Sequence, residues 1–154
     1  MNVGLCMNIS DILSLECVTL DIDCHSKKDA LDILAKTIAG SDKATSQIEV
    51  FDCLCARERL GSTGLGGGIA IPHGRLKNSK KTIAAFLQLE NSVDYYAVDN
   101  IFVDLIFALI VPEDSTDEHL QALAMLADVF SDKKTISKLR ESRSSAEIFS
   151  ILTK

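Results

Sequence analysis

The chain has 154 residues, of which 47% are hydrophobic and 25% charged, so it is long enough to bury the core of one domain and too apolar to be disordered. Its formal net charge is −6, and no dense cluster of Lys and Arg occurs. This excludes a typical nucleic-acid binder, because phosphate contacts need such clusters. The five cysteines form no regular framework, which favours reduced thiols and a cytoplasmic location.

The sequence gives no sign of a targeting or membrane segment. The first residues lack the basic region and apolar core of a signal peptide. The longest apolar stretch, Ile101 to Val111, has only eleven residues and contains Asp104, so it is too short to span a bilayer. With no repeat or linker inside the chain, we expect a loose leader over residues 1–7 and one domain over residues 8–154.

Helical spacing dominates the first third of the chain. Ser10 is a candidate cap for a short helix from Asp11 to Leu15, and Val18 to Ile22 is a candidate strand. Ser26 and Asp29 have the spacing of a capping box, which predicts a helix that begins after Ser26.

Two glycines are predicted to end the first long helices. Gly40 can adopt the left-handed backbone conformation that commonly ends a helix, so it is predicted to end the helix that follows Ser26. A second helix is predicted from Ser46 to Leu60, with Gly61 after its end. Its predicted inner face consists of Ile48, Phe51, Leu54 and Cys55.

The middle of the chain predicts buried strands. Residues 61–68 form a loop with five glycines, followed by a short strand, Ile69 to Ile71, which Pro72 stops because proline cannot donate to a ladder. Thr82 to Leu89 and Ile101 to Val111 are longer strands, and the second is apolar enough to be covered on both faces.

Three further helices are predicted after the last strand. Ser115 and Glu118 form a second capping-box pattern that opens a helix to about Phe130, followed by helices from Lys133 to Glu141 and from Ala146 to Leu152. Helices interleaved with buried strands predict an α/β domain in which a mixed sheet lies between helical layers.

Of the three histidines, His73 is the strongest candidate for chemistry. It is predicted in a loop at the carboxyl end of a buried strand, where α/β proteins place their sites, beside glycines that permit close approach of another molecule. His119 lies in the first turn of the helix after the strand Ile101 to Val111. If that strand runs parallel to Ile69–Ile71, both histidines reach the same edge of the sheet. His25 is interpreted as a polar residue beside a helix cap.

A histidine at such a site suits phosphoryl transfer. Neutral imidazole offers one nucleophilic nitrogen while the other can donate a hydrogen bond, and histidine forms covalent intermediates. A guanidinium would stabilise the transferred group, and Arg57 and Arg75 are candidates. The sequence lacks the nucleotide-binding motif G-x-x-x-x-G-K-[ST], the full dinucleotide-binding motif and the G-x-S-x-G motif of serine nucleophiles. Cys53 and Cys55 are two residues apart on a predicted helix, so their side chains diverge and are poorly placed to bind one metal ion.

The segment from Ala56 to Leu76, ARERLGSTGLGGGIAIPHGRL, resembles the active-site signature of the fructose/mannitol-type enzyme IIA domains (EIIA type 2) of the bacterial phosphotransferase system. Within that family the chain most resembles the nitrogen-regulatory IIA proteins, over about residues 9–152. One departure is Gly67–Gly68, where a bulkier polar residue often precedes the second glycine.

The resemblance implies a mixed sheet with helices on both sides and a set of roles. His73 would be phosphorylated on Nε2 by a phosphocarrier protein of the HPr type (NPr type), and Arg57 and His119 would line the phosphoryl site, with no metal or other cofactor. The protein would then regulate partner proteins according to its phosphorylation state. Two alternatives stay open: a sugar-specific IIA subunit that serves a separate IIB domain, and a binding module that is not phosphorylated.

Overall fold

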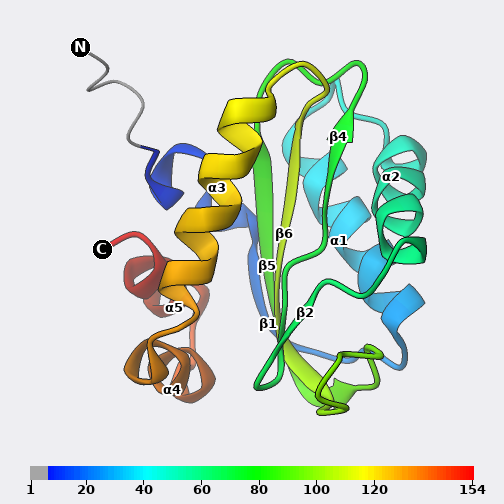
Figure 1. Cartoon of the computed structure of the whole chain (residues 1–154). Coiled ribbons are helices and arrows are strands. Elements are labelled where there is room, and N and C mark those ends of the chain that lie inside the picture. The colour runs from blue at the N-terminus through cyan, green and yellow to red at the C-terminus, as the bar shows by residue number, and fades with distance from the viewer. Residues whose placement is uncertain (1–6) are drawn as a thin grey trace.

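The computed structural model describes residues 7–154 and shows one mixed sheet between two layers of helices (Figure 1). On one side lie α1 (Lys27–Ser41) and α2 (Gln47–Arg59); on the other lie α3 (Thr116–Val129), α4 (Lys133–Glu141) and α5 (Ser145–Leu152). The predicted α/β class is confirmed. No described helix is long and apolar enough to cross a membrane. The predicted leader, residues 1–7, falls outside the described residues except for Met7, which packs against the core.

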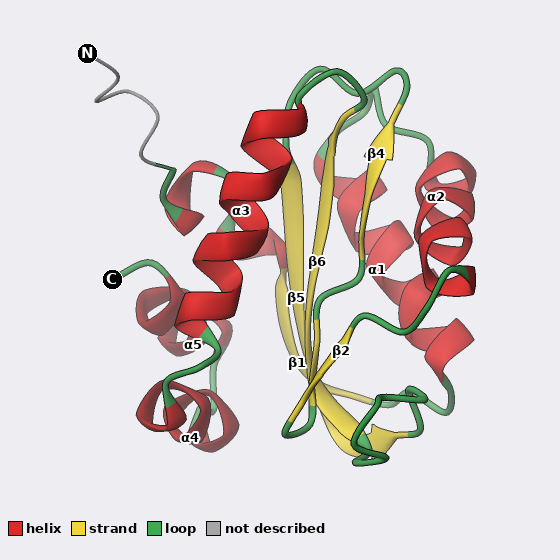
Figure 2. Ribbon diagram, in the orientation of Figure 1, coloured by secondary structure: helices red, strands yellow, loops and turns green. Residues whose placement is uncertain are grey.

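Within the described residues the sheet has six strands: β1 (Val18–Ile22), β2 (Gly64–Gly66), β3 (Ile69–Ala70), β4 (His73–Leu76), β5 (Ile83–Val93) and β6 (Val103–Pro112). Their order is β1-β5-β6-β3-β2. Strand β4 also pairs with β6 and lies beside it in Figure 2. Strands β3 and β4 both run parallel to β6, whereas β5 runs antiparallel to it. The parallel pairing on which the meeting of His73 and His119 depended is therefore present.

Strand β6 is the centre of the core, as its apolar sequence predicts. From Leu105 to Val111 every residue is fully buried, because helices cover both faces of the sheet. Phe107 packs edge-to-face against Phe86 of β5 and Phe130 after α3, with ring centroids 6.3 and 6.1 Å apart. These contacts fix α3 against the sheet, and α3 carries His119.

His73 begins a strand, so the prediction that it lies in a loop after Pro72 is wrong. The glycine segment is likewise not a plain loop, since Gly64–Gly66 forms β2 and pairs with β3. Pro72 interrupts the ladder but does not end it, because its carbonyl accepts a hydrogen bond from the N–H of Leu109, at 3.0 Å. Pairing with β6 then resumes at His73, which lies opposite Leu109.

Two predictions about the first helices are also wrong. The helix expected from Asp11 to Leu15 is replaced by two short 3-10 turns, Ile9–Asp11 and Leu15–Cys17. Between them the carbonyl of Ile12 accepts from the N–H of Ala84 in β5, so this backbone pairs with the sheet. Gly40 does not stop α1, which continues to Ser41.

The packing faces and caps of two later helices differ from expectation. On α2 the predicted Leu54 is fully buried, and Phe51 and Cys55 are half-buried against the core. Ile48 is 73% exposed, and Val50 and Glu58 are buried instead, because contacts with α1 and β4 set the rotation of the helix. Ser115 does precede α3 but its side chain makes no capping bond. Glu118 instead accepts a hydrogen bond from the hydroxyl of Thr82, which directly precedes β5.

Candidate phosphoryl-transfer site

His73 is held with its two ring nitrogens in different roles. Nδ1 lies 2.8 Å from the carbonyl oxygen of Ile71. A carbonyl can only accept, so Nδ1 carries the hydrogen and the neutral ring keeps its lone pair on Nε2. Because Ile71 and His73 flank Pro72, whose φ is fixed by its ring, the local backbone holds this orientation.

The surroundings of His73 keep its ring neutral. Burial lowers the pKa of His73 below its ordinary 6.5, the hydrogen bond to Ile71 opposes this shift, and the positive charge of Arg57 adds to it. The imidazole is therefore a free base at neutral pH, which is the form in which Nε2 is a nucleophile.

His119 lies against His73, as the parallel strands predicted. The two rings are 5.2 Å apart between centroids and meet edge to face at 67°. Nε2 of His119 is buried and has no hydrogen-bond partner among the described residues. Burial and then the neighbouring His73, Arg75 and Arg57 lower the pKa of His119. A buried unpaired ring nitrogen is costly, so this atom is suited to a ligand that brings a partner.

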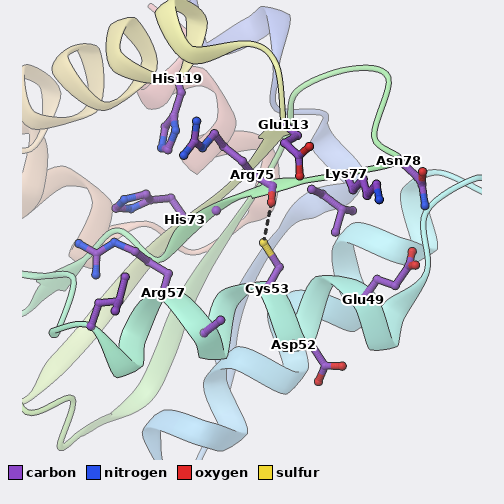
Figure 3. A pocket seen from close by; sticks show the side chains of 14 residues that line it. Glu49, Asp52, Cys53, Arg57, His73, Arg75, Lys77, Asn78, Glu113 and His119 are labelled. Atoms are coloured by element: carbon purple, nitrogen blue, oxygen red, sulfur yellow. Dashed lines mark hydrogen bonds between the residues drawn. The ribbon is translucent and has the colours of Figure 1, made fainter.

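Two arginines reach the same cleft from different elements (Figure 3). Arg57, in the last turn of α2, donates from Nη1 to the carbonyl of Gly61 at 2.9 Å. Arg75 lies two residues after His73 on β4, so both side chains leave the same face of the strand. Its Nη1 is 3.4 Å from the hydroxyl of Thr116 at the start of α3. The cleft has a volume of about 910 Å³.

Residues 11–154 match the family described as "Phosphoenolpyruvate-dependent sugar phosphotransferase system, EIIA 2". The chain belongs to this family. A nitrogen regulatory protein from Klebsiella oxytoca is 40% identical over 154 residues, which cover 99% of this chain and 94% of that protein. The crystal structure of nitrogen regulatory protein IIA-Ntr from Neisseria meningitidis has a TM-score of 0.88 at 42% identity, over 94% of this chain and 99% of that one.

A more distant solved structure shares the fold. It is the complex of enzyme IIAMtl and phosphorylated enzyme IIBMtl from Escherichia coli, with a TM-score of 0.77 at 22% identity, over 92% of this chain and 98% of that one. The likeness at this identity concerns the fold alone.

In this EIIA domain the cleft brings together the three residues that the sequence singles out for the site, His73, Arg57 and His119, and also Arg75. His25 lies elsewhere. It is exposed, and its Nε2 is 3.4 Å from a carboxylate oxygen of Asp23, which fits its interpretation as a surface residue.

Sequence reasoning missed the part of Cys53 and Gly74 in building the cleft. Cys53 lines the cleft, and its thiol donates to the carbonyl of Arg75 at 3.3 Å (Figure 3). A Cβ at Gly74 would lie 2.5 Å from Sγ of Cys53, so only glycine lets α2 come this close to β4. The sequence did offer one signal: a glycine directly after a candidate nucleophile can indicate that another segment packs closely against that position.

Proposed function

We propose that this EIIA domain is a phosphocarrier of a nitrogen-related phosphotransferase system. It accepts a phosphoryl group on Nε2 of His73 from an HPr-like carrier (NPr type), and its phosphorylation state controls its binding to target proteins. Relatives named nitrogen regulatory protein, about 40% identical over almost the whole chain, support the assignment. The free thiols of Cys17, Cys24, Cys53 and Cys55 support a reducing, cytoplasmic setting.

The observation that carries the proposal is the hydrogen bond from Nδ1 of His73 to the Ile71 carbonyl. In the transfer, the lone pair of Nε2 forms the new bond to phosphorus while the carrier's phosphorus–nitrogen bond breaks and its electron pair returns to the carrier's imidazole. As the ring of His73 becomes positive, its Nδ1–H becomes a stronger donor to Ile71. The backbone thus stabilises the product without a metal or a proton transfer.

The surrounding side chains have roles that follow from their charge. The phosphoryl group carries negative charge that spreads over its oxygens in the transition state, and Arg57 and Arg75 both bring guanidinium groups to the cleft. His119 would donate from Nε2 to one phosphoryl oxygen, which gives its unpaired nitrogen a partner. No side chain of the site needs to change its protonation state.

A sugar-specific IIA subunit is the second candidate. A fructose-specific EIIABC component from Bacillus subtilis, 27% identical over 95% of this chain and 23% of that protein, keeps it open. Incubation of the phosphorylated protein with purified sugar-specific IIB domains separates the two. Onward transfer to a IIB domain supports the second candidate, and retention of the phosphate supports the regulator.

The test of the proposal is carrier-dependent phosphorylation followed by intact-mass measurement and site mapping. The wild type should gain one phosphate at His73, and His73→Ala should gain none, with a nearly unchanged melting temperature. His25→Ala is the matched control, since it removes an exposed histidine outside the cleft, and it should be phosphorylated like the wild type. Absence of phosphate on the wild type would leave only the unphosphorylated binding module.

A further inference from the structure

Helix α2 ends with a buried carboxylate that does not line the cleft. Glu58 directly follows Arg57 and is only 8% exposed. A carboxylate at this end of a helix faces the negative pole of the helix dipole, and burial adds the cost of losing water. Ion pairs and hydrogen bonds must therefore stabilise the buried carboxylate, and the residues that make them identify the segments that it links.

The partners of Glu58 come from three separate segments. Lys27 of α1 places Nζ 2.8 Å from Oε1. The backbone N–H of Thr63 donates to Oε1 at 3.1 Å, and the Thr63 hydroxyl donates to Oε2. Tyr95, fully buried after β5, donates to Oε2 at 3.2 Å. The carboxylate thus ties the end of α2 to α1, to the glycine segment and to the segment that follows β5.

This network also holds the segment that contains the hydrogen-bond acceptor of Arg57. Thr63 lies two residues after Gly61, whose carbonyl accepts the hydrogen bond from Nη1 of Arg57 at 2.9 Å. The turn between Glu58 and Thr63 therefore has one end fixed by the buried carboxylate, and the acceptor for Arg57 lies within it. The N–H of Gly61 also donates to the backbone carbonyl of Glu58 at 3.1 Å, so Gly61 is held between the end of α2 and Thr63. A displacement of Thr63 would shift the Gly61 peptide and weaken the contact that orients the guanidinium of Arg57.

We propose that Glu58, acting through Thr63 and the Gly61 carbonyl, is the positioning residue that fixes the guanidinium of Arg57 at the phosphoryl site. The inference rests on the proposed function, because it assigns Arg57 a place in phosphoryl transfer. Glu58 and Thr63 do not themselves line the cleft. The charge of the Glu58 carboxylate also raises the pKa of His73, so the route through Arg57 is tested with Thr63 variants, which leave that charge in place.

The first variant is Thr63→Val, which removes the hydroxyl donor to Glu58 and keeps the shape of the side chain. We expect roughly tenfold slower phosphorylation, as is typical of a misplaced charged group, with unchanged carrier docking. Thr63→Ser keeps the hydroxyl and should restore the rate. The matched control is Thr37→Val, which makes the same change in α1, where the hydroxyl bonds only to Ile33 of its own helix. Tyr95→Phe, which removes the second hydroxyl donor to Oε2, replaces Thr63→Val if that variant fails to fold.

A double-mutant cycle decides whether the effect passes through Arg57. In an Arg57→Ala background, Thr63→Val should cause no further loss of rate. Equal losses in the presence and absence of Arg57 would overturn the proposal, as would a wild-type rate for Thr63→Val.

A second readout does not depend on phosphorylation. NMR relaxation of the Nε–H of Arg57 should report an ordered guanidinium in the wild type and in Thr37→Val, and a mobile one in Thr63→Val. Unchanged order of Arg57 in Thr63→Val would overturn the positioning role. If the wild type accepts no phosphate, the proposed function fails, and the relaxation measurement alone still decides whether Glu58 and Thr63 position Arg57.

Discussion

His73 combines nucleophilicity with a fixed protonation state through two separate features. Its burial disfavours the charged ring, and the Ile71 carbonyl determines which nitrogen keeps the hydrogen. Because burial lowers the pKa of His73 while Nε2 remains available, the ring is ready for attack over the whole range above its pKa.

The pH dependence follows from the direction of that shift. The folded-state pKa of His73 lies below the 6.5 of an unfolded imidazole, so just below pH 6.5 the unfolded chain binds more protons than the folded one. Stability should therefore decline as pH falls through this window, and His73 should contribute no pH dependence above it. NMR titration of His73 should give a midpoint below 6.5, and a midpoint above 6.5 would contradict the buried free base.

Arg57 should matter for transfer and not for docking. We expect Arg57→Ala to slow phosphorylation by about 10²- to 10³-fold, as is typical when a group that stabilises transition-state charge is removed, and to leave carrier affinity nearly unchanged. Rapid-quench kinetics and a binding titration separate the two effects. Arg59→Ala is the control, because Arg59 lies on the same turn of α2 but outside the cleft. Equal losses in both variants would assign the effect to general surface charge.

At the scale of elements, the cleft depends on how closely α2 packs against β4. Gly74 of β4 lies under Cys53 of α2 with no room for a side chain. This contact sets the separation between Arg57, at the end of α2, and His73, at the start of β4. The spacing of the Arg57 and His73 side chains is therefore determined by Gly74 and Cys53, which need not touch the phosphoryl group of the proposed function.

Gly74→Ala should disturb both stability and transfer. The added methyl group would meet Sγ of Cys53, and overpacking of this kind costs about 1–3 kcal/mol. Cys53→Ala in the same chain removes the sulfur and should recover much of both losses. Urea unfolding and phosphorylation rates measure the effect. A double variant as impaired as Gly74→Ala alone would show that the contact with Cys53 is not the cause.

Across the whole molecule, β6 joins the site to the core. It pairs with β3, β4 and β5, and its residues from Leu105 to Val111 are fully buried in a sheet that lies between the two helical layers. Tyr95, although distant in sequence from Glu58 of α2, donates a hydrogen bond to the same carboxylate that pairs with Lys27 of α1. The arrangement leaves no natural boundary at which part of residues 8–154 could unfold alone.

We therefore expect residues 8–154 to unfold as one cooperative unit. The near-ultraviolet signal of buried Tyr95 and the far-ultraviolet signal of the helices should follow the same denaturation curve. Two separated transitions would show that the helices on one side of the sheet form an independent unit.

Most elements were predictable because they depend on local pattern. Helical spacing after Ser26 and Ser46 and the apolar run in β6 gave the correct element types, and the parallel pairing with β6 that would bring His73 and His119 together was stated as a condition. Errors arose where tertiary contacts override the local signal. Pro72 interrupts a strand without ending it because Leu109 supplies a donor to its carbonyl, and α2 turns Val50 inward because α1 and β4 set its rotation.

The sequence by itself determined which side chains are chemically suited to phosphoryl transfer. His73 between Pro72 and Gly74, and Arg57 near the end of a predicted helix, can be recognised from residue type and local pattern alone. Only the tertiary structure decided which nitrogen of His73 is free, how close His119 lies and what orients Arg57. Each of these depends on a backbone carbonyl or a buried partner from another part of the chain, and such partners become neighbours only when the chain folds.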